Sequence, residues 1–176
     1  MTADLRYPIG KFDASAPITP DQRIATIAAI DTLPALLRSA VAGLTGAQLD
    51  TPYRPDGWSV RQLVHHVADS HLNAVTRVRL ALTENTPTIK PYNEKAWAEL
   101  EDARMYPVGP SLQILDGVHE RWVVLLRSLS DADFARTVVH PEHGRTMSID
   151  VLAALYAWHG RHHTRHVTAL REREGW

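Results

Sequence analysis

Apolar residues recur three or four positions apart in long stretches of this chain. Between residues 59 and 83 this spacing is followed by Val60, Val64, Val67, Ala74, Val75, Val78 and Leu82. Between residues 111 and 128 it is followed by Leu112, Leu115, Val118, Trp122, Leu125 and Leu126. Side chains with this period share one face of a helix, and that face is buried by packing on other helices. The pattern predicts an all-α protein built as a helical bundle.

Capping residues and prolines set the expected bounds of the helices. Capping boxes, formed by Thr19 with Gln22 and by Ser59 with Gln62, open two of the helices. Long helices are expected at residues 19–42, 59–83, 111–128 and 148–173, with a short one near residue 93. Pro34 is expected to bend or break the first of them. The strand-like stretch 137–139 is expected to form no more than a short hairpin.

The chain is predicted to be a single domain of residues 1–176. Its length is close to that of one ordinary domain, and no repeat, low-complexity tract or linker divides it. Residues 1–17 are expected to form an extended arm, because Pro8 and Pro17 prevent regular structure there. Residues 140–144, with the sequence His-Pro-Glu-His-Gly, are expected to form a turn.

Charge and hydropathy exclude two classes of partner. The chain has 19 basic and 20 acidic side chains, whereas proteins that bind nucleic acid or anionic membranes carry a marked basic excess. No stretch approaches the roughly 18 consecutive apolar residues of a membrane span. The charged N-terminal residues contain no apolar run and do not resemble a secretory signal. We expect a cytoplasmic protein that binds neither nucleic acid nor membrane.

Cysteine is absent, whereas the chain contains 10 histidines. The absence of cysteine excludes disulfides, thiolate ligands and a cysteine nucleophile. If the protein performs thiol chemistry, the thiol must therefore arrive on a substrate. Histidine is therefore the soft ligand type that this chain offers to a transition metal.

Two histidines of the last helix, His159 and His163, are the first candidates for a metal site. They are four residues apart, so their imidazoles project from one face of the helix about one turn apart. Such a pair is half of a zinc site, and a third histidine from another helix would leave one coordination position open, as in catalytic zinc sites. The alternative is a solvated basic helix. His162 lies near the centre of the apolar face and is expected to be buried and hydrogen-bonded.

The second long helix carries three further histidines. His66 lies on a polar edge with Ser70, Asn73 and Arg77, which could border a site, whereas His71 lies in the middle of the apolar face. Periodicity alone leaves open which of the two is a ligand, and His71 also fits a hydrogen-bonded core histidine. His65 points away from both and is expected to be exposed. A closed metal site, with His162 or His71 as a fourth ligand, would indicate a structural site.

Nearby polar residues leave further alternatives open. Asp69 could orient a ligand histidine, or it could be a surface carboxylate facing Arg61 or Arg77. Asn73 could orient a substrate or be a surface amide. The zinc peptidases with a His-Glu-x-x-His helix are excluded, because Gly160 follows His159 where those enzymes carry the glutamate base.

Five segments of the chain resemble one known family, the DinB-like or YfiT family of metal-dependent hydrolases, in its bacillithiol-transferase branch. These segments are YPIG (7–10), LDTPYR (49–54), GWSVRQLVHHVADSH (57–71), PYNEKAW (91–97) and YAWHGRHH (156–163). The resemblance extends over nearly the whole chain. It departs from the family at Arg161, where a third adjacent histidine is common, and this position lies outside the ligand set.

The resemblance implies a fold, a cofactor and an assembly. The fold is an antiparallel four-helix bundle with up-down-down-up connectivity, and the assembly is a homodimer. The cofactor is one divalent metal ion per chain, zinc with nickel as the alternative. Matched to the family pattern, the metal ligands are His66, His159 and His163.

Such a centre could catalyse two reactions. A water molecule on the metal would ionise near neutral pH, with a pKa of about 7 against about 15.7 in bulk, and would serve hydrolysis. A thiol on the metal would lose its proton and attack an electrophile. The resemblance favours a thiol S-transferase that joins a low-molecular-weight thiol such as bacillithiol to an electrophilic small molecule. The alternatives are a metal-dependent hydrolase and a non-enzymatic metal- or ligand-binding bundle.

Overall fold

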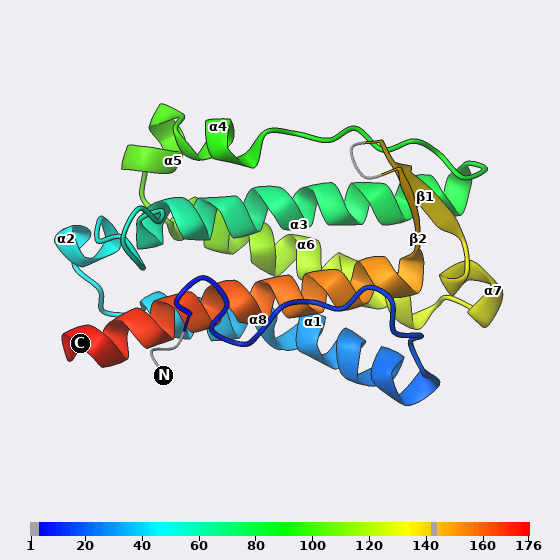
Figure 1. Cartoon of the computed structure of the whole chain (residues 1–176), viewed down its shortest axis with the longest axis horizontal. Helices are drawn as coiled ribbons and strands as arrows, with labels where there is room; N and C mark the ends of the chain where they lie inside the picture. The colour runs from blue at the N-terminus through cyan, green and yellow to red at the C-terminus, as the bar shows by residue number, and fades with distance from the viewer. Residues whose placement is uncertain (1–3, 142–143) are drawn as a thin grey trace.

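The structure is a computed structural model that describes residues 4–141 and 144–176. Its elements in chain order are α1 (Pro20–Val41), α2 (Gly46–Leu49), α3 (Val60–Thr83), α4 (Glu94–Ala98), α5 (Glu101–Met105), α6 (Gly109–Arg127), α7 (Asp131–Phe134), β1 (Thr137–His140), β2 (Arg145–Ser148) and α8 (Ile149–Glu174). The long helices α1, α3, α6 and α8 lie together as a bundle (Figure 1). The all-α bundle predicted from the apolar spacing is confirmed.

The connectivity of the bundle is up-down-down-up. α1 and α8 run in one direction, whereas α3 and α6 run in the opposite direction (Figure 1). α1 packs against α6 and α8, and α3 packs against the same two helices, so α1 and α3 lie diagonally across the bundle. Because α3 and α6 are consecutive long helices that run in parallel, the chain must return along the bundle between them, and α4 and α5 lie on this return segment (Figure 1).

The helices begin where the capping residues predict. Thr19 and Ser59 each accept a hydrogen bond from the backbone of a glutamine three residues later, and each glutamine side chain bonds back. α2 begins with the same arrangement at Thr45 and Gln48. This capping box is visible in the sequence, but the helix it opens is too short to show apolar periodicity.

α1 is not broken at Pro34 but continues through it to Val41. Proline has no backbone N–H, so the carbonyl four residues earlier, that of Ile30, loses its partner within the helix. The Ile30 carbonyl instead accepts a hydrogen bond from Nδ1 of His119 on α6, at 2.6 Å. A side chain of the neighbouring helix thus replaces the missing bond.

The core consists of two hydrophobic clusters at different levels of the bundle. The first surrounds Trp122 and the second surrounds Leu63; both residues are fully buried. On α3, α6 and α8, the residues between the two clusters include His71, His119 and His159. A layer of histidines therefore crosses the interior between the two apolar halves.

The hairpin and the N-terminal arm complete the fold. β1 pairs antiparallel with β2, with Thr137 opposite Ser148, so the strand-like stretch does form a short hairpin. The predicted turn at residues 140–144 includes residues 142 and 143, which lie outside the described residues, as do residues 1–3 of the arm. The described part of the arm, residues 4–17, contains no helix or strand, as predicted. It lies along α8, where the rings of Phe12 and Trp158 are 6.1 Å apart.

Among the described helices, α1 is the one that is long and apolar enough to cross a membrane by length and composition alone. In this fold, however, its side chains at Ile30, Leu33 and Leu37 are buried in the bundle core. The core helix of a bundle meets the same test as a membrane span, and α1 is such a helix here.

α8 approaches α1 closely at Gly160. A Cβ atom placed on this glycine would lie 2.3 Å from Cδ2 of Leu33 and 2.7 Å from its Cδ1. The absence of a side chain at residue 160 therefore allows the two helices to pack, one position after His159.

Candidate metal centre

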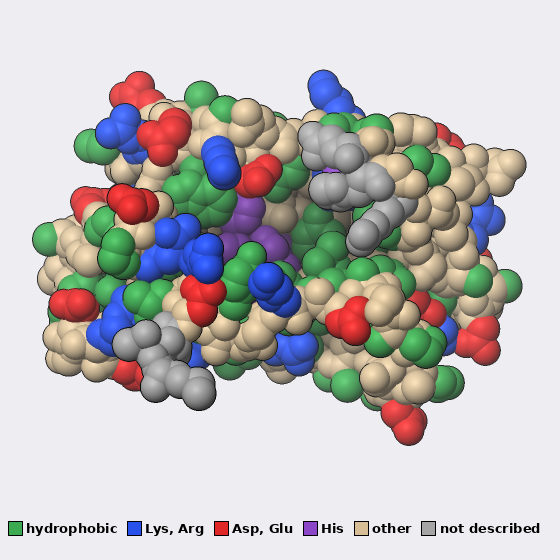
Figure 2. All heavy atoms as spheres, viewed as in Figure 1, with side chains coloured by type: hydrophobic (Ala, Val, Ile, Leu, Met, Phe, Trp, Pro, Cys, Tyr) green, Lys and Arg blue, Asp and Glu red, His purple; other side chains and the backbone are tan. Residues whose placement is uncertain are grey.

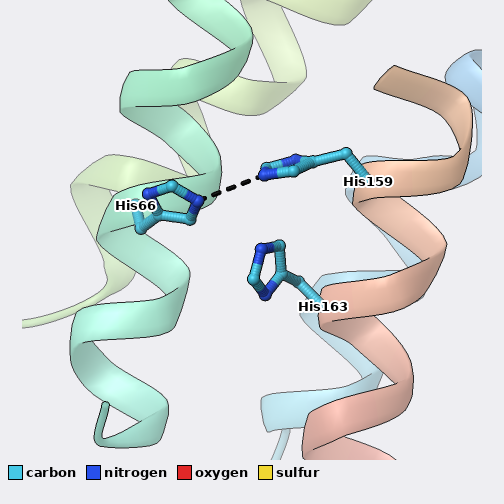
Figure 3. A group of neighbouring side chains, drawn as sticks. All are labelled: His66, His159 and His163. Carbon is cyan, nitrogen blue, oxygen red and sulfur yellow. Dashed lines mark hydrogen bonds between the residues drawn. The ribbon is translucent and has the colours of Figure 1, made fainter. Parts of the chain in front are cut away.

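His66 on α3 and His159 and His163 on α8 face one another across the interface of these two helices (Figure 3). The Nε2 atoms of His66 and His159 are 3.1 Å apart, and the three rings offer nitrogens that all lie within 4.8 Å of one another. In a tetrahedral zinc site with Zn–N bonds of about 2.0–2.1 Å, two ligand nitrogens lie about 3.3–3.4 Å apart. The three histidines identified as candidate ligands are therefore brought together at a spacing that suits one divalent ion.

The ionisation of these histidines also suits a metal ion. Burial lowers the pKa of His66 to about 4. Burial, reinforced by the neighbouring histidines, places the pKa values of His159 and His163 well below the ordinary value. All three imidazoles are therefore neutral at physiological pH, and the neutral form is the one that binds a metal.

His71 lies beside this group and not within it. Its Nε2 is 3.2 Å from Nδ1 of His159, and its Nδ1 is 2.9 Å from Nε2 of His119. Both ring nitrogens of His71 are thus engaged by other histidines. The geometry agrees with the interpretation of His71 as a hydrogen-bonded core histidine, and it offers no free nitrogen for a fourth ligand.

A second group of histidines, His162, His163 and His166, lies further along α8. His162 is buried, as predicted, but its buried Nδ1 has no hydrogen-bond partner in the described structure. Its ring stacks on Trp158 with 4.4 Å between the ring centroids. Nδ1 of His166 is 3.4 Å from Nδ1 of His163. His163 therefore belongs to both groups, whereas His162 does not belong to the group that includes His66.

The first group lies at a pocket of about 470 Å³. Figure 2 shows histidine side chains inside a hollow on this face of the molecule. The pocket is lined by Trp58, His66, Ser70, Arg77, Pro91, Tyr92, Glu94, His140, Tyr156, His159 and His163. Trp58 packs against the ring of His66, with 4.7 Å between the centroids. Aromatic side chains therefore form much of the wall beside the three histidines.

Two tyrosine hydroxyl groups and a cation line the pocket. Arg77 Nη1 donates a hydrogen bond to the Tyr156 hydroxyl at 2.9 Å. Burial raises the pKa of Tyr92 to about 12, so its hydroxyl keeps its proton at neutral pH. The pocket thus offers hydrogen-bond donors near the imidazoles.

One histidine is not where the sequence predicted it. His65 was expected to be exposed, but it is buried, with Nδ1 2.7 Å from Ser111 Oγ and Nε2 3.1 Å from the Tyr106 carbonyl oxygen. The segment that joins α5 to α6 covers this side of α3. The apolar periodicity of α3 alone does not show that another segment buries this side of the helix.

Asn73 and Asp69 do not line the pocket. Asn73 Nδ2 donates a hydrogen bond to the backbone carbonyl of Asp69, so the side-chain amide binds its own helix and not the pocket. The two arginines proposed to face Asp69 have other partners: Arg61 binds Asp50, and Arg77 binds Tyr156.

Sequence reasoning missed several residues of the pocket. Trp58 and Tyr92 come from loops, which have no periodicity to place them. Tyr156 lies three residues before His159, close to it in angle around the helix, so helical spacing alone could have drawn attention to it.

Comparison with known proteins places this chain in a family. A family model for the DinB superfamily matches residues 29–167. Proteins of Bacillus cereus (strain B4264) and Bacillus mycoides (strain KBAB4), both named "putative metal-dependent hydrolase", are each 54% identical over 173 residues, which covers 98% of this chain and 99% of theirs. Among solved structures, that of YfiT from Bacillus subtilis has a TM-score of 0.96 and 45% sequence identity, and the match covers 99% of both chains. YfiT is described as "a probable metal-dependent hydrolase with an unusual four-helix bundle topology".

The family model spans most of the chain, and the similar proteins match it over nearly their full length at more than half identity. The fold of YfiT and the fold described above are the same at the level of the whole bundle. The chain therefore belongs to the DinB superfamily.

Proposed function

We propose that this protein is a metal-dependent thiol S-transferase in which His66, His159 and His163 hold one divalent ion, zinc in preference to nickel. The observation that carries the proposal is the convergence of three neutral imidazoles, from two helices, at a pocket. A divalent ion held there would lower the pKa of a thiol or water molecule that reaches it. The names of the similar proteins support the dependence on a metal.

An enzymatic centre is favoured over a structural one. Structural zinc sites have four protein ligands, whereas catalytic sites have three and an open position. His71, the nearest histidine that could close the site from α3, uses both ring nitrogens in other contacts. The group of three therefore has an open side, and the pocket gives small molecules access to it.

Thiol transfer is favoured over hydrolysis by the lining of the pocket. Among its described lining residues, Glu94 is the one carboxylate, and its side chain is exposed. A metal-dependent hydrolase usually places a carboxylate base beside the attacking water, and no buried carboxylate lines this pocket in the described part of the chain. The hydrolase remains the second candidate because the similar proteins carry that name.

The other residues of the pocket have roles that suit transfer to an electrophile. Trp58, Tyr92 and Tyr156 provide flat apolar surfaces on which an aromatic or unsaturated electrophile can pack. The hydroxyl groups of the two tyrosines can donate hydrogen bonds to a leaving group. The thiol comes from a low-molecular-weight substrate, because the chain has no cysteine.

We also propose a cytoplasmic location and a homodimer. Low-molecular-weight thiols are kept reduced in the cytoplasm, so the reaction belongs there. The homodimer rests on the family resemblance, and light scattering coupled to size-exclusion chromatography tests it.

The function is tested with zinc-loaded protein, bacillithiol and 1-chloro-2,4-dinitrobenzene. The expected reaction forms a carbon–sulfur bond and breaks the carbon–chlorine bond, so chloride leaves and the thiol proton passes to solvent. We expect the conjugate to form faster than in protein-free solution, as followed by its absorbance.

The matched control is metal-stripped protein, in which the rate should fall to the uncatalysed level. Hydrolysis of esters or amides without any thiol, together with no acceleration of conjugate formation, would instead support the hydrolase. Unfolding of the protein on removal of the metal would indicate a structural site.

A further inference from the structure

A chain of hydrogen-bonded histidines crosses the whole bundle. It begins at the Ile30 carbonyl oxygen on α1, which lies 2.6 Å from Nδ1 of His119 on α6. Nε2 of His119 is 2.9 Å from Nδ1 of His71 on α3, and Nε2 of His71 is 3.2 Å from Nδ1 of His159 on α8. The chain thus passes once through all four long helices and ends at a candidate metal ligand.

The direction of every hydrogen bond in this chain follows from its first acceptor. A carbonyl oxygen cannot donate, so Nδ1 of His119 carries the proton of the first bond. A neutral imidazole has a single N–H, so Nε2 of His119 must accept, and Nδ1 of His71 donates to it. By the same step Nδ1 of His159 donates to Nε2 of His71. The lone pair of His159 Nε2 is then left facing His66.

The neutral state of the two interior rings follows from their surroundings. His71 and His119 have exposures of 0% and 1%, and no carboxylate is hydrogen-bonded to either in the described structure. An imidazolium buried in this way would lack an anionic partner, which is strongly unfavourable. Each of these two rings is therefore neutral and carries a single N–H.

Pro34 makes the first acceptor available. In an unbroken α-helix the carbonyl of Ile30 would accept from the N–H of residue 34, but proline has none. As a consequence, the carbonyl of Ile30, a fully buried residue, accepts its hydrogen bond from His119 instead. The proline that the sequence marked as a helix breaker thus determines the polarity of the histidine chain.

We propose that His71 and His119 are positioning residues that hold His159 in the tautomer whose Nε2 lone pair points at the metal. The inference rests on the proposed metal site, and it assigns a function to two histidines outside the ligand set. Partners that hydrogen-bond the second nitrogen of a metal-ligating histidine typically change metal affinity by about 10- to 100-fold. His71 is such a partner, and His119 acts through it.

The first test measures tautomers in the unmutated, metal-free protein. Long-range ¹H–¹⁵N NMR spectra distinguish a protonated Nδ1 from a protonated Nε2 in each ring. We expect His71, His119 and His159 all to carry the proton on Nδ1. A proton on Nε2 of His71 or His119 would overturn the proposal, and this measurement does not depend on catalysis or on metal binding.

The second test compares two replacements of His119. A glutamine can donate from its amide to the Ile30 carbonyl and accept from His71, so His119→Gln preserves the direction of the chain, whereas His119→Leu interrupts it. We expect zinc affinity, measured by competition with a chelator, to fall by about 10-fold in His119→Leu and by much less in His119→Gln.

His65→Leu is the matched control, because His65 is also a buried histidine with two hydrogen-bonded ring nitrogens but lies outside the chain. It should bind zinc as the unmutated protein does. Equal zinc affinity in His119→Leu and His65→Leu would refute the positioning role. If the unmutated protein itself binds no zinc, the proposed function fails, and the NMR test still decides the tautomers.

Arg77 supports a second, independent inference about the substrate. It lines the pocket of the three histidines, but it forms no ion pair with a carboxylate of the described residues. Its Nη1 donates to the Tyr156 hydroxyl, its Nη2 lies 3.5 Å from the Lys90 carbonyl oxygen, and its Nε is buried without a partner. The guanidinium at the pocket wall is therefore a cation whose charge is not neutralised.

We infer that Arg77 binds an anionic group, such as a carboxylate, on the thiol or the electrophile. This inference rests on the proposed function, because it assumes that the pocket holds a substrate. A guanidinium pairs with carboxylates through two parallel hydrogen bonds, and such charge-assisted bonds are stronger than neutral ones. Exposed Glu94, which also lines the pocket, is acidic and cannot take this role.

The test uses protein loaded with cobalt(II), whose absorption reports a bound thiolate. We expect 3-mercaptopropionate to bind about 10-fold more tightly than uncharged 2-mercaptoethanol, given the usual strength of hydrogen bonds to charged groups. Arg77→Gln should lose this preference and keep its affinity for 2-mercaptoethanol. Arg79→Gln, an exposed arginine on the same helix that does not line the pocket, should keep the preference.

Equal affinity of the unmutated protein for the two thiols would overturn the inference. Binding of neither thiol would instead refute the thiol-transferase proposal. In that case propanoate tests the anion site. A change in the cobalt spectrum of the unmutated protein that is absent in Arg77→Gln would support the site, and no such difference would refute it.

Discussion

Replacement of His163 by alanine is expected to abolish metal binding and to lower the rate of thiol transfer by about 1,000-fold, while the bundle stays folded. A metal ion supplies several kcal/mol of catalytic stabilisation, and each 1.36 kcal/mol corresponds to a tenfold change in rate. With two of the three imidazoles left, the ion loses a ligand from the helix that provides two of them. The metal content of the purified variant and the rate of conjugate formation measure the effect.

Two further variants test whether the loss of metal is specific to the proposed ligands. His66→Ala removes the proposed ligand from α3 and should have the same effect, because the proposed site draws imidazoles from both helices. His162→Ala, at the adjacent buried position of α8, lies outside this group and should retain the metal. Circular dichroism reports whether each variant is folded. A folded His163→Ala protein with normal zinc affinity would contradict the assigned ligand set.

Acidification is expected to destabilise the metal-free protein well before its carboxylates with lowered pKa values titrate. Burial lowers the pKa values of His66, His162 and His166 from 6.5 to about 4. Between these values the unfolded chain binds protons that the folded protein does not, so the free energy of unfolding falls as pH falls. The stabilisation is complete above about pH 6.5 and is lost progressively toward pH 4.

The size of this effect is considerable for a small protein. One proton contributes about 1.4 kcal/mol per pH unit, so three such histidines contribute up to about 4 kcal/mol per pH unit. The pKa values of His71, His159 and His163 are lowered as well, which acts in the same direction. Total stabilities are typically about 5–15 kcal/mol, so acid unfolding is expected in this pH range.

Denaturant unfolding of the metal-free protein at several pH values between 7.5 and 5 measures the slope. His162→Gln removes one of the titrating groups and should reduce the slope by up to about 1.4 kcal/mol per pH unit. A free energy of unfolding that does not change between pH 7 and 5.5 would show that these histidines are not held neutral by burial.

The long helices could be predicted from the sequence because their determinants are local. Capping residues fix the starts of α1 and α3, and apolar periodicity fixes their buried faces. α2, α5 and α7 were missed because helices of four or five residues contain too few turns to show a period. The order of the helices around the bundle came from the family resemblance, because apolar spacing does not specify which neighbour a face will meet.

The candidate site could be predicted only in part. The spacing of His159 and His163 placed both on one face of α8, which is a local property. The choice between His66 and His71 was not local, because it depends on which of them meets α8 at the pocket and which meets His119 inside the bundle. The burial of His65 depends in the same way on a segment more than forty positions away, which bonds its ring through Tyr106 and Ser111.

The close approach of α8 to α1 at Gly160 also restricts how this centre could evolve. Helix-borne metallopeptidases carry their glutamate base at the residue after the first histidine of the helix, which is position 160 in this chain. The Cβ atom of a side chain at that position would meet Leu33 of α1, and Gly160 is not among the residues that line the pocket. A glutamate at that position would require Leu33 to move. A lineage that acquired a peptidase-like base would therefore more readily recruit it from another helix or a loop.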